Sequence, residues 1–173
     1  MVSAVVYKSN SGSCEKYARK IGEALNVPVY EAAHCPLARG REVVYVSWLL
    51  NGTAYGYKLA EAFFLVRAVV AVGMSAPSEK TVETLRAKDG IPAVVPVFAL
   101  QGGFDMNKLP HVFALMMKLV NPKIVEKIEN LKKTRELTAE ETACYNMAKN
   151  GYGEPASWDG IDAVIDALKT AKV

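Results

Sequence analysis

The chain has 173 residues, of which 51% are hydrophobic and 23% are charged, and its formal net charge is +3 at pH 7. This length and apolar content suit one domain with a sizeable core over residues 1–173, and no stretch reaches the ~20 apolar residues of a membrane-spanning helix. Three widely spaced cysteines, Cys14, Cys35 and Cys144, argue against a disulfide framework or a zinc site. We expect a cytoplasmic protein without a bound metal.

The N-terminal segment predicts a strand, a short polar loop and a helix in succession. Residues Val2–Tyr7 are mostly apolar, and Lys16–Leu25 carries apolar residues at helical spacing. The loop between them consists of Ser9, Asn10, Ser11, Gly12, Ser13 and Cys14. Backbone N–H groups at a helix start have no partners within the helix and favour anions, while hydroxyls add donors. The pattern indicates a phosphate-binding loop, although an ordinary helix N-cap favours the same residue types.

The loop lacks the features of two common nucleotide sites. A Walker loop needs a Lys directly before its final Ser or Thr, and Gly12–Glu15 contains no Lys. The glycine pattern of dinucleotide folds is absent too, because no second glycine precedes Gly22. The ligand that still suits this loop is a single phosphate monoester, held by neutral hydrogen-bond donors. The loop resembles the FMN phosphate loop of flavodoxins, with Cys14 in the place of that signature's final Thr.

Strand and helix patterns alternate along the rest of the chain, which is typical of a parallel sheet covered on both faces. The expected later strands are Val27–Tyr30, Val43–Ser47, Ala68–Gly73 and Ala93–Leu100. The expected later helices are Tyr57–Phe64, Ser78–Ala87 and Ala156–Ala171. This rhythm matches a flavodoxin-like, doubly wound α/β fold with five parallel strands in the order 2-1-3-4-5.

In that order the loops after strands 1, 3 and 4 converge, and we expect them to share an FMN pocket. The loop after the third strand contributes Trp48, Leu49, Leu50, Asn51, Gly52 and Tyr55, and the loop after the fourth contributes Gly73, Met74, Ser75 and Ala76. Trp48 or Tyr55 is suited to stack on the flavin ring. The resemblance implies that the Asn51–Gly52 peptide turns a carbonyl toward flavin N5 on reduction. The alternative is a hairpin-like turn in which Trp48 only fills the core.

Residues 101–155 make an unusually long connection before the last helix, and we expect a helical insertion. Phe113–Val120 is strongly apolar, and Ile124–Leu131 has helical periodicity. Thr138 is expected to be a helix N-cap, with Glu141 at the capping-box position. We expect Gly151–Pro155 to interrupt the helical pattern before the last helix.

The junction Phe98–Asp105, followed by Lys108, Leu109 and the run Met116–Leu119, is similar to one branch of flavodoxin-like proteins. These are the flavodoxin domain proteins related to menaquinone-dependent protoporphyrinogen oxidase. The resemblance implies an insertion that helps substrate and quinone meet the flavin, with peripheral contact to a membrane. The alternative is that Phe113–Val120 packs the insertion against the sheet.

The sequence therefore predicts an FMN-binding flavoprotein for electron transfer or flavin-dependent redox chemistry, with a redox protein, a small molecule or a quinone as partner. No catalytic residue is assigned. A quinone-linked oxidase and a cofactor-free binding module are the alternatives. Phosphatase chemistry through Cys14 is disfavoured, because Lys20 lies where such enzymes need an Arg. No nucleic-acid-binding motif is found, and His34 and His111 lack partners at metal-ligand spacing.

Overall fold

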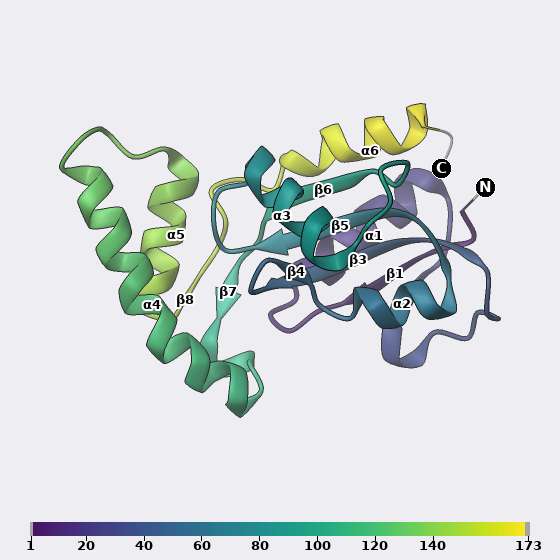
Figure 1. The fold of residues 1–173 in the computed structure, drawn as a ribbon, viewed down its shortest axis with the longest axis horizontal. Helices are drawn as coiled ribbons and strands as arrows, with labels where there is room; N and C mark the ends of the chain where they lie inside the picture. Colours follow the sequence, from purple (N-terminus) through teal and green to yellow (C-terminus); the bar gives the residue numbers. More distant parts are fainter. Residues whose placement is uncertain (1, 172–173) are drawn as a thin grey trace.

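The computed structural model describes residues 2–171, and its centre is a mostly parallel β-sheet with helices on both faces (Figure 1). Met1 and residues 172–173 of the expected domain lie outside the described residues. The sheet contains β1 (Ala4–Lys8), β2 (Val29–Glu31), β3 (Glu42–Leu50), β4 (Thr53–Ala54), β5 (Leu65–Gly73) and β6 (Val97–Gln101). Parallel strands follow the order β2-β1-β3-β5-β6, and β4 pairs antiparallel with β3. The expected α/β class with a mostly parallel sheet is confirmed.

Two cores form because successive residues of a strand point to opposite faces of the sheet. In β3, Val44 and Val46 belong to one core, whereas Val43 and Tyr45 belong to the other. The first core is covered by α1 (Ser13–Leu25) and α6 (Gly160–Thr170), and the second by α2 (Tyr57–Phe63) and α3 (Glu79–Asp89). Valine-rich strands suit this double burial, since β-branched side chains pack well on a pleated surface.

The segment expected to be a loop after the third strand is instead a β-hairpin. β3 continues to Leu50 and returns as β4 through the two residues Asn51 and Gly52. Both have positive φ values, 51° and 79°, which is the geometry of a type I′ turn and the reason for an Asn-Gly pair there. The alternative of a hairpin-like turn is therefore correct for the path of the chain, and the expected third strand, Val43–Ser47, stops three residues before β3 ends.

The insertion forms an arm on a narrow two-stranded ribbon that leads away from the main sheet (Figure 1). It contains β7 (Phe104–Asp105), the 3₁₀ turn η2 (Met106–Lys108), α4 (His111–Lys132), α5 (Ala139–Asn150) and β8 (Tyr152–Gly153). A shorter 3₁₀ turn, η1 (Ala32–His34), follows β2. The two apolar segments on either side of Pro122 belong to one continuous helix, α4, and the expected break at 151–155 contains β8. Within residues 2–171, no helix has both the length and the apolar character needed to cross a membrane.

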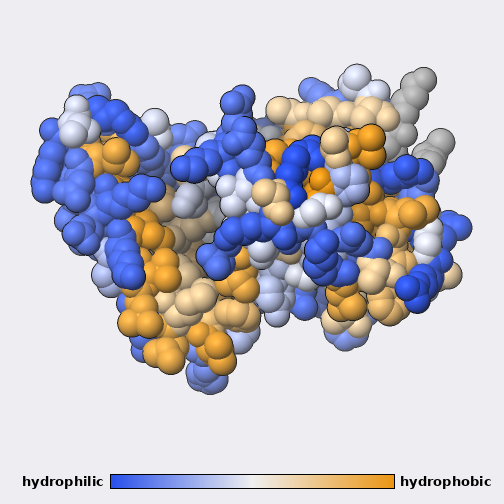
Figure 2. All heavy atoms as spheres, in the orientation of Figure 1, coloured by the Kyte–Doolittle hydropathy of each residue, from blue (hydrophilic) through white to orange (hydrophobic). Residues whose placement is uncertain are grey.

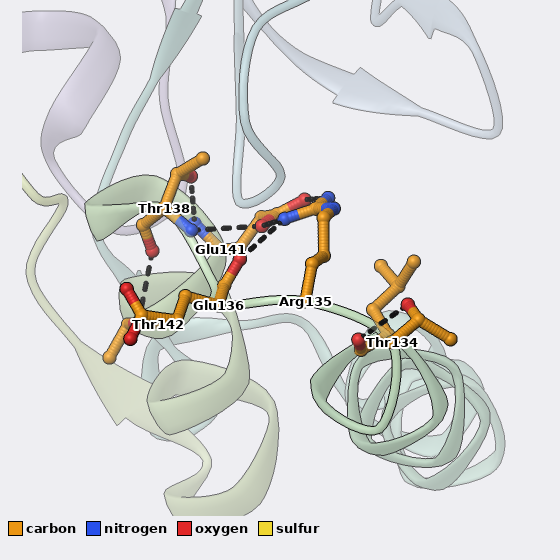
Figure 3. A network of polar contacts seen from close by, with 7 residues as sticks. Thr134, Arg135, Glu136, Thr138, Glu141 and Thr142 are labelled. Atoms are coloured by element: carbon orange, nitrogen blue, oxygen red, sulfur yellow. Dashed lines mark hydrogen bonds and ion pairs between the residues drawn. The ribbon is translucent and has the colours of Figure 1, made fainter.

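The turn between α4 and α5 is held by the expected capping box (Figure 3). The Thr138 hydroxyl accepts a hydrogen bond from the backbone N–H of Glu141 at 3.2 Å, and the Glu141 carboxylate accepts one from the N–H of Thr138 at 3.0 Å. The guanidinium of Arg135 donates to both oxygens of the same carboxylate, at 2.6 and 2.8 Å. The prediction of Thr138 as the N-cap is confirmed.

Buried Gln101 ties the arm to the main sheet. Its amide nitrogen donates to the backbone carbonyl of Met74 at 2.9 Å and to that of Glu140 at 2.8 Å. Its amide oxygen accepts from the backbone N–H of Ala156 at 3.0 Å. One side chain at the end of β6 therefore joins the end of β5, the start of α5 and the segment before α6.

Candidate functional site

A cavity of about 520 Å³ lies where the carboxyl ends of β1, β3, β5 and β6 meet. Its wall contains ten of the residues predicted to bind a cofactor: Asn10, Ser11, Ser13, Cys14, Trp48, Leu49, Leu50, Asn51, Gly73 and Met74. Three segments that are far apart in the sequence thus meet at one edge of the sheet, which is where open parallel sheets bind ligands.

The other predicted residues lie beside or behind the cavity: Ser9, Gly12, Gly52, Tyr55, Ser75 and Ala76. Ser9 and Gly12 line a smaller hollow of about 270 Å³ on the outer side of the first loop. Gly52 lies against α3, where an added Cβ would be 2.9 Å from a methyl carbon of Thr84. Ser75 is near α5, with its hydroxyl 3.9 Å from the sulfur of Cys144.

The hydroxyls of the first loop are engaged by the protein itself. Both the Ser11 and the Ser13 hydroxyl donate to the carbonyl of Gly103, at 3.0 and 3.2 Å, and the N–H of Gly12 donates to the Ser9 hydroxyl at 3.1 Å. Gly12 is the N-cap of α1, and no side chain caps this helix end. The loop is therefore not an ordinary side-chain N-cap, but two of its hydroxyl protons are directed at Gly103 and not at a ligand.

Close contact between the first loop and the end of β6 requires glycine at position 102. A Cβ on Gly102 would lie 2.4 Å from a methyl carbon of Val72 and 2.9 Å from the Cβ of Ser13. The sequence analysis did not assign Gly102 or Gly103 to the site. The sequence feature that could have identified them is a pair of adjacent glycines shortly after the predicted strand Ala93–Leu100.

An aromatic cluster forms one wall of the cavity. The Trp48 and Tyr55 rings stack with centroids 4.5 Å apart and an interplanar angle of 28°. Phe113 of α4 meets the Trp48 ring edge-on, with centroids 5.1 Å apart and an angle of 77°. Trp48 lines the cavity and Tyr55 does not, so Trp48 is the member of the pair placed to contact a ligand.

Two buried donors near this wall lack a hydrogen-bond partner within the protein. They are the indole N–H of Trp48 and the side-chain amide nitrogen of Asn10. Both residues line the cavity. A buried donor without an acceptor costs free energy, but protein atoms cover both nitrogens, so a ligand could bond to them only after the covering side chains move.

The roof of the cavity comes from the insertion and is entirely apolar. It consists of Leu109, Val112, Phe113, Met116, Met117 and Val120. Figure 2 shows the hollow between the α4–α5 arm and the main body, with apolar surface along α4. One side of the apolar run in the insertion, with Phe113, Met116 and Met117, therefore faces the site, and Phe113 also packs on Trp48 of β3.

Cys14 is unsuited to act as a nucleophile. It is 2% exposed, and burial raises the pKa of its thiol to about 12, which keeps it protonated at neutral pH. The helix start does not lower this pKa enough to offset burial. Across residues 2–171 there is also no group of three or more His, Cys, Asp or Glu side chains that could hold a metal ion.

No match to the chain is found among protein-family models, curated proteins or solved structures. The functional conclusion therefore depends on the geometry of the site.

Proposed function

We propose that the 520 Å³ cavity binds FMN and that the protein is a flavodoxin-like flavoprotein with electron-transfer or flavin-dependent redox chemistry. The observation that carries the proposal is that three segments line one cavity. They are the polar loop at the start of α1, the aromatic cluster with Trp48, and the end of β5. The parallel strand order β2-β1-β3-β5-β6 supports the flavodoxin-like resemblance. A volume of this size is typical of cofactor sites.

The residues present fit a flat ring with polar edges. Trp48 offers an indole to one side of the ring, with Tyr55 stacked behind it. The unpaired donors of Trp48 and Asn10 belong to residues of the cavity wall, and a shift of the atoms that cover them would let them bond to the ligand. FMN would supply the electron-transfer chemistry when bound, and the chain would bind it, orient it and exclude water.

The hairpin turn changes the role expected for Asn51 and Gly52. The Lys88 ammonium donates to the carbonyl of Asn51 at 2.7 Å, and Gly52 lies against α3. A change in this peptide's orientation would break the contact to Lys88. We therefore propose that the hairpin serves mainly to position Trp48, and that any peptide movement on reduction is opposed by Lys88.

A quinone-linked oxidase is the second candidate function, and the apolar roof favours it. Seven apolar residues of the insertion line the cavity, Phe104 and the six of the roof, with no charged side chain among them. Such a surface accepts an uncharged, flat, apolar partner more readily than a charged nucleotide, because burying an unpaired charge is costly. Anaerobic reoxidation of the reduced flavoprotein by a short-chain quinone would support this candidate, and a rate equal to that without quinone would contradict it.

The test of the main proposal is the visible absorption spectrum after adding FMN to the purified protein and removing the excess. We expect retained flavin near one per chain, with bands shifted from those of free FMN. The far-ultraviolet circular dichroism of the same sample controls for folding. Folded protein without flavin would contradict the proposal and favour a cofactor-free binding module.

A further inference from the structure

Three hollows surround the loop 9–13, and the side chain of Lys108 lines two of them. One is a hollow of about 440 Å³ between the loop and the β7–β8 ribbon, and the other is the 270 Å³ hollow on the outer side. Lys108 belongs to η2, the turn that begins the insertion. The Asp105 carboxylate caps this turn by accepting from the N–H of Asn107 at 3.0 Å. The backbone that carries a cation remote from the loop in sequence is thus held beside it, while the Lys108 side chain is exposed.

A phosphate at this loop needs positive charge from elsewhere. The Ser11 and Ser13 hydroxyls donate to Gly103. Acidic side chains also line the two hollows: Glu15 and Glu31 in the smaller one, Asp105 and Glu154 in the larger. A phosphate dianion would be repelled by these carboxylates, and the partial charge at the start of α1 is a modest compensation.

Two lysines line the hollows beside the loop, Lys16 one of them and Lys108 both, although neither lines the 520 Å³ cavity. The Lys16 ammonium lies 3.5 Å from the centre of the Trp158 ring, in a cation–π contact, and lines only the larger hollow. The Lys108 ammonium is 3.8 Å from the Asp105 carboxylate, and its side chain is 60% exposed. Exposed pairs of this kind contribute little free energy, so Lys108 can move to a phosphate at small cost.

We propose that Lys108 binds the terminal phosphate of FMN, so that the insertion completes the cofactor site and favours FMN over riboflavin. The inference rests on the proposed function, since it assigns a residue to the same ligand. Lys108 would form a charge-assisted hydrogen bond to the phosphate, which is stronger than the neutral donors of the loop can offer.

The experiment compares FMN and riboflavin binding, by quenching of flavin fluorescence, in wild-type protein and the variants K108Q, K108R and K123Q. Lys123 is exposed on α4 and lines none of the three hollows, so K123Q is the matched control for loss of one positive charge. For K108Q we expect FMN affinity to fall about tenfold or more, with riboflavin affinity unchanged. K108R should retain most of the FMN affinity, and K123Q should behave as wild type.

The salt dependence gives an independent readout. FMN affinity of the wild type should fall with rising salt more steeply than that of K108Q, because screening weakens a phosphate–lysine contact. Equal losses for FMN and riboflavin, or a K108Q variant with wild-type FMN affinity, would overturn the role of Lys108 while leaving flavin binding intact. A folded wild-type protein that binds neither flavin would overturn the proposed function, and this inference with it.

Discussion

Trp48 is the residue whose side chain most directly links the fold to the proposed cofactor. Its ring lines the cavity with Tyr55 behind it, so W48A should weaken FMN binding by about 1 to 3 kcal/mol, the scale of base–aromatic stacking. The measurement is a fluorescence titration. Y55F keeps the ring that supports Trp48 and should change the affinity little. Unaltered FMN affinity in W48A would show that the indole does not contact the flavin.

Asn121 in α4 is a buried polar residue whose side-chain amide makes no hydrogen bond within residues 2–171. It is 4% exposed, and both its amide nitrogen and its amide oxygen lack a hydrogen-bond partner. Replacing such a side chain by an apolar one removes the desolvation cost, so N121L should raise the free energy of unfolding by about 1 to 3 kcal/mol. Urea unfolding measures it, with exposed Asn130 replaced in N130L as the control. A destabilised N121L would reveal a polar role for this amide.

At the scale of elements, the α4–α5 turn carries a pH dependence. The hydrogen bonds from Arg135 and then from the Thr138 backbone lower the pKa of Glu141 to about 2. A carboxylate whose pKa is lowered by folding stabilises the folded state above its unfolded pKa of about 4.3, and this contribution disappears as the pH falls through about 2. Wild-type protein should therefore exceed E141Q in unfolding free energy at pH 6, and the difference should shrink between pH 4.5 and pH 2. Urea titrations at each pH test this.

The control for Glu141 is E136Q, which removes the same charge from the same turn without touching the capping box. A pH-independent difference between wild type and E141Q would contradict the role of the carboxylate.

The sequence predicted best those elements that depend on residues close together in the chain. The capping box at Thr138 and Glu141 follows from residues three positions apart, and α3 begins directly after Ser78, where the helix was expected to start. The hairpin at Asn51–Gly52 was only the alternative interpretation, because aromatic and glycine residues after an apolar strand resemble a binding loop. The continuity of α4 through Pro122 was missed. It depends on packing against α5, and local propensity opposes it.

At the scale of the whole molecule, residue patterns predicted the loops of the site, whereas only the family resemblance implied that the insertion reaches it. The loops after β1 and β5 were predictable, since carboxyl ends of parallel strands share one edge. The position of Phe113 against Trp48 was not, because it depends on how the β7–β8 ribbon and the bonds of Gln101 orient the arm. Long-range geometry of that kind leaves no periodic signal in the chain.

The arm also has an outward apolar stripe, which leads to the prediction of peripheral membrane contact. Leu115 and Leu119 are 63% and 70% exposed and do not line the cavity, and Val112 of the cavity roof is 76% exposed beside them. The exposed Lys118 and Lys123 lie next to the stripe in sequence. Apolar side chains beside lysines favour the surface of an anionic bilayer, and such contact would place the apolar roof of the cavity next to lipid.

Sedimentation with vesicles containing anionic lipid should therefore carry down the wild-type protein, and L115E should reduce the bound fraction about tenfold, because burial of one leucine contributes roughly 1.5 to 3 kcal/mol. The matched control is L59E, since Leu59 is similarly exposed, at 64%, but belongs to α2 on the main body. High salt should weaken binding of the wild type by screening the lysines. If L59E and L115E lose binding equally, the contact is a general charge effect and does not involve the stripe. If the wild type stays in solution with every lipid composition, the stripe does not bind membranes.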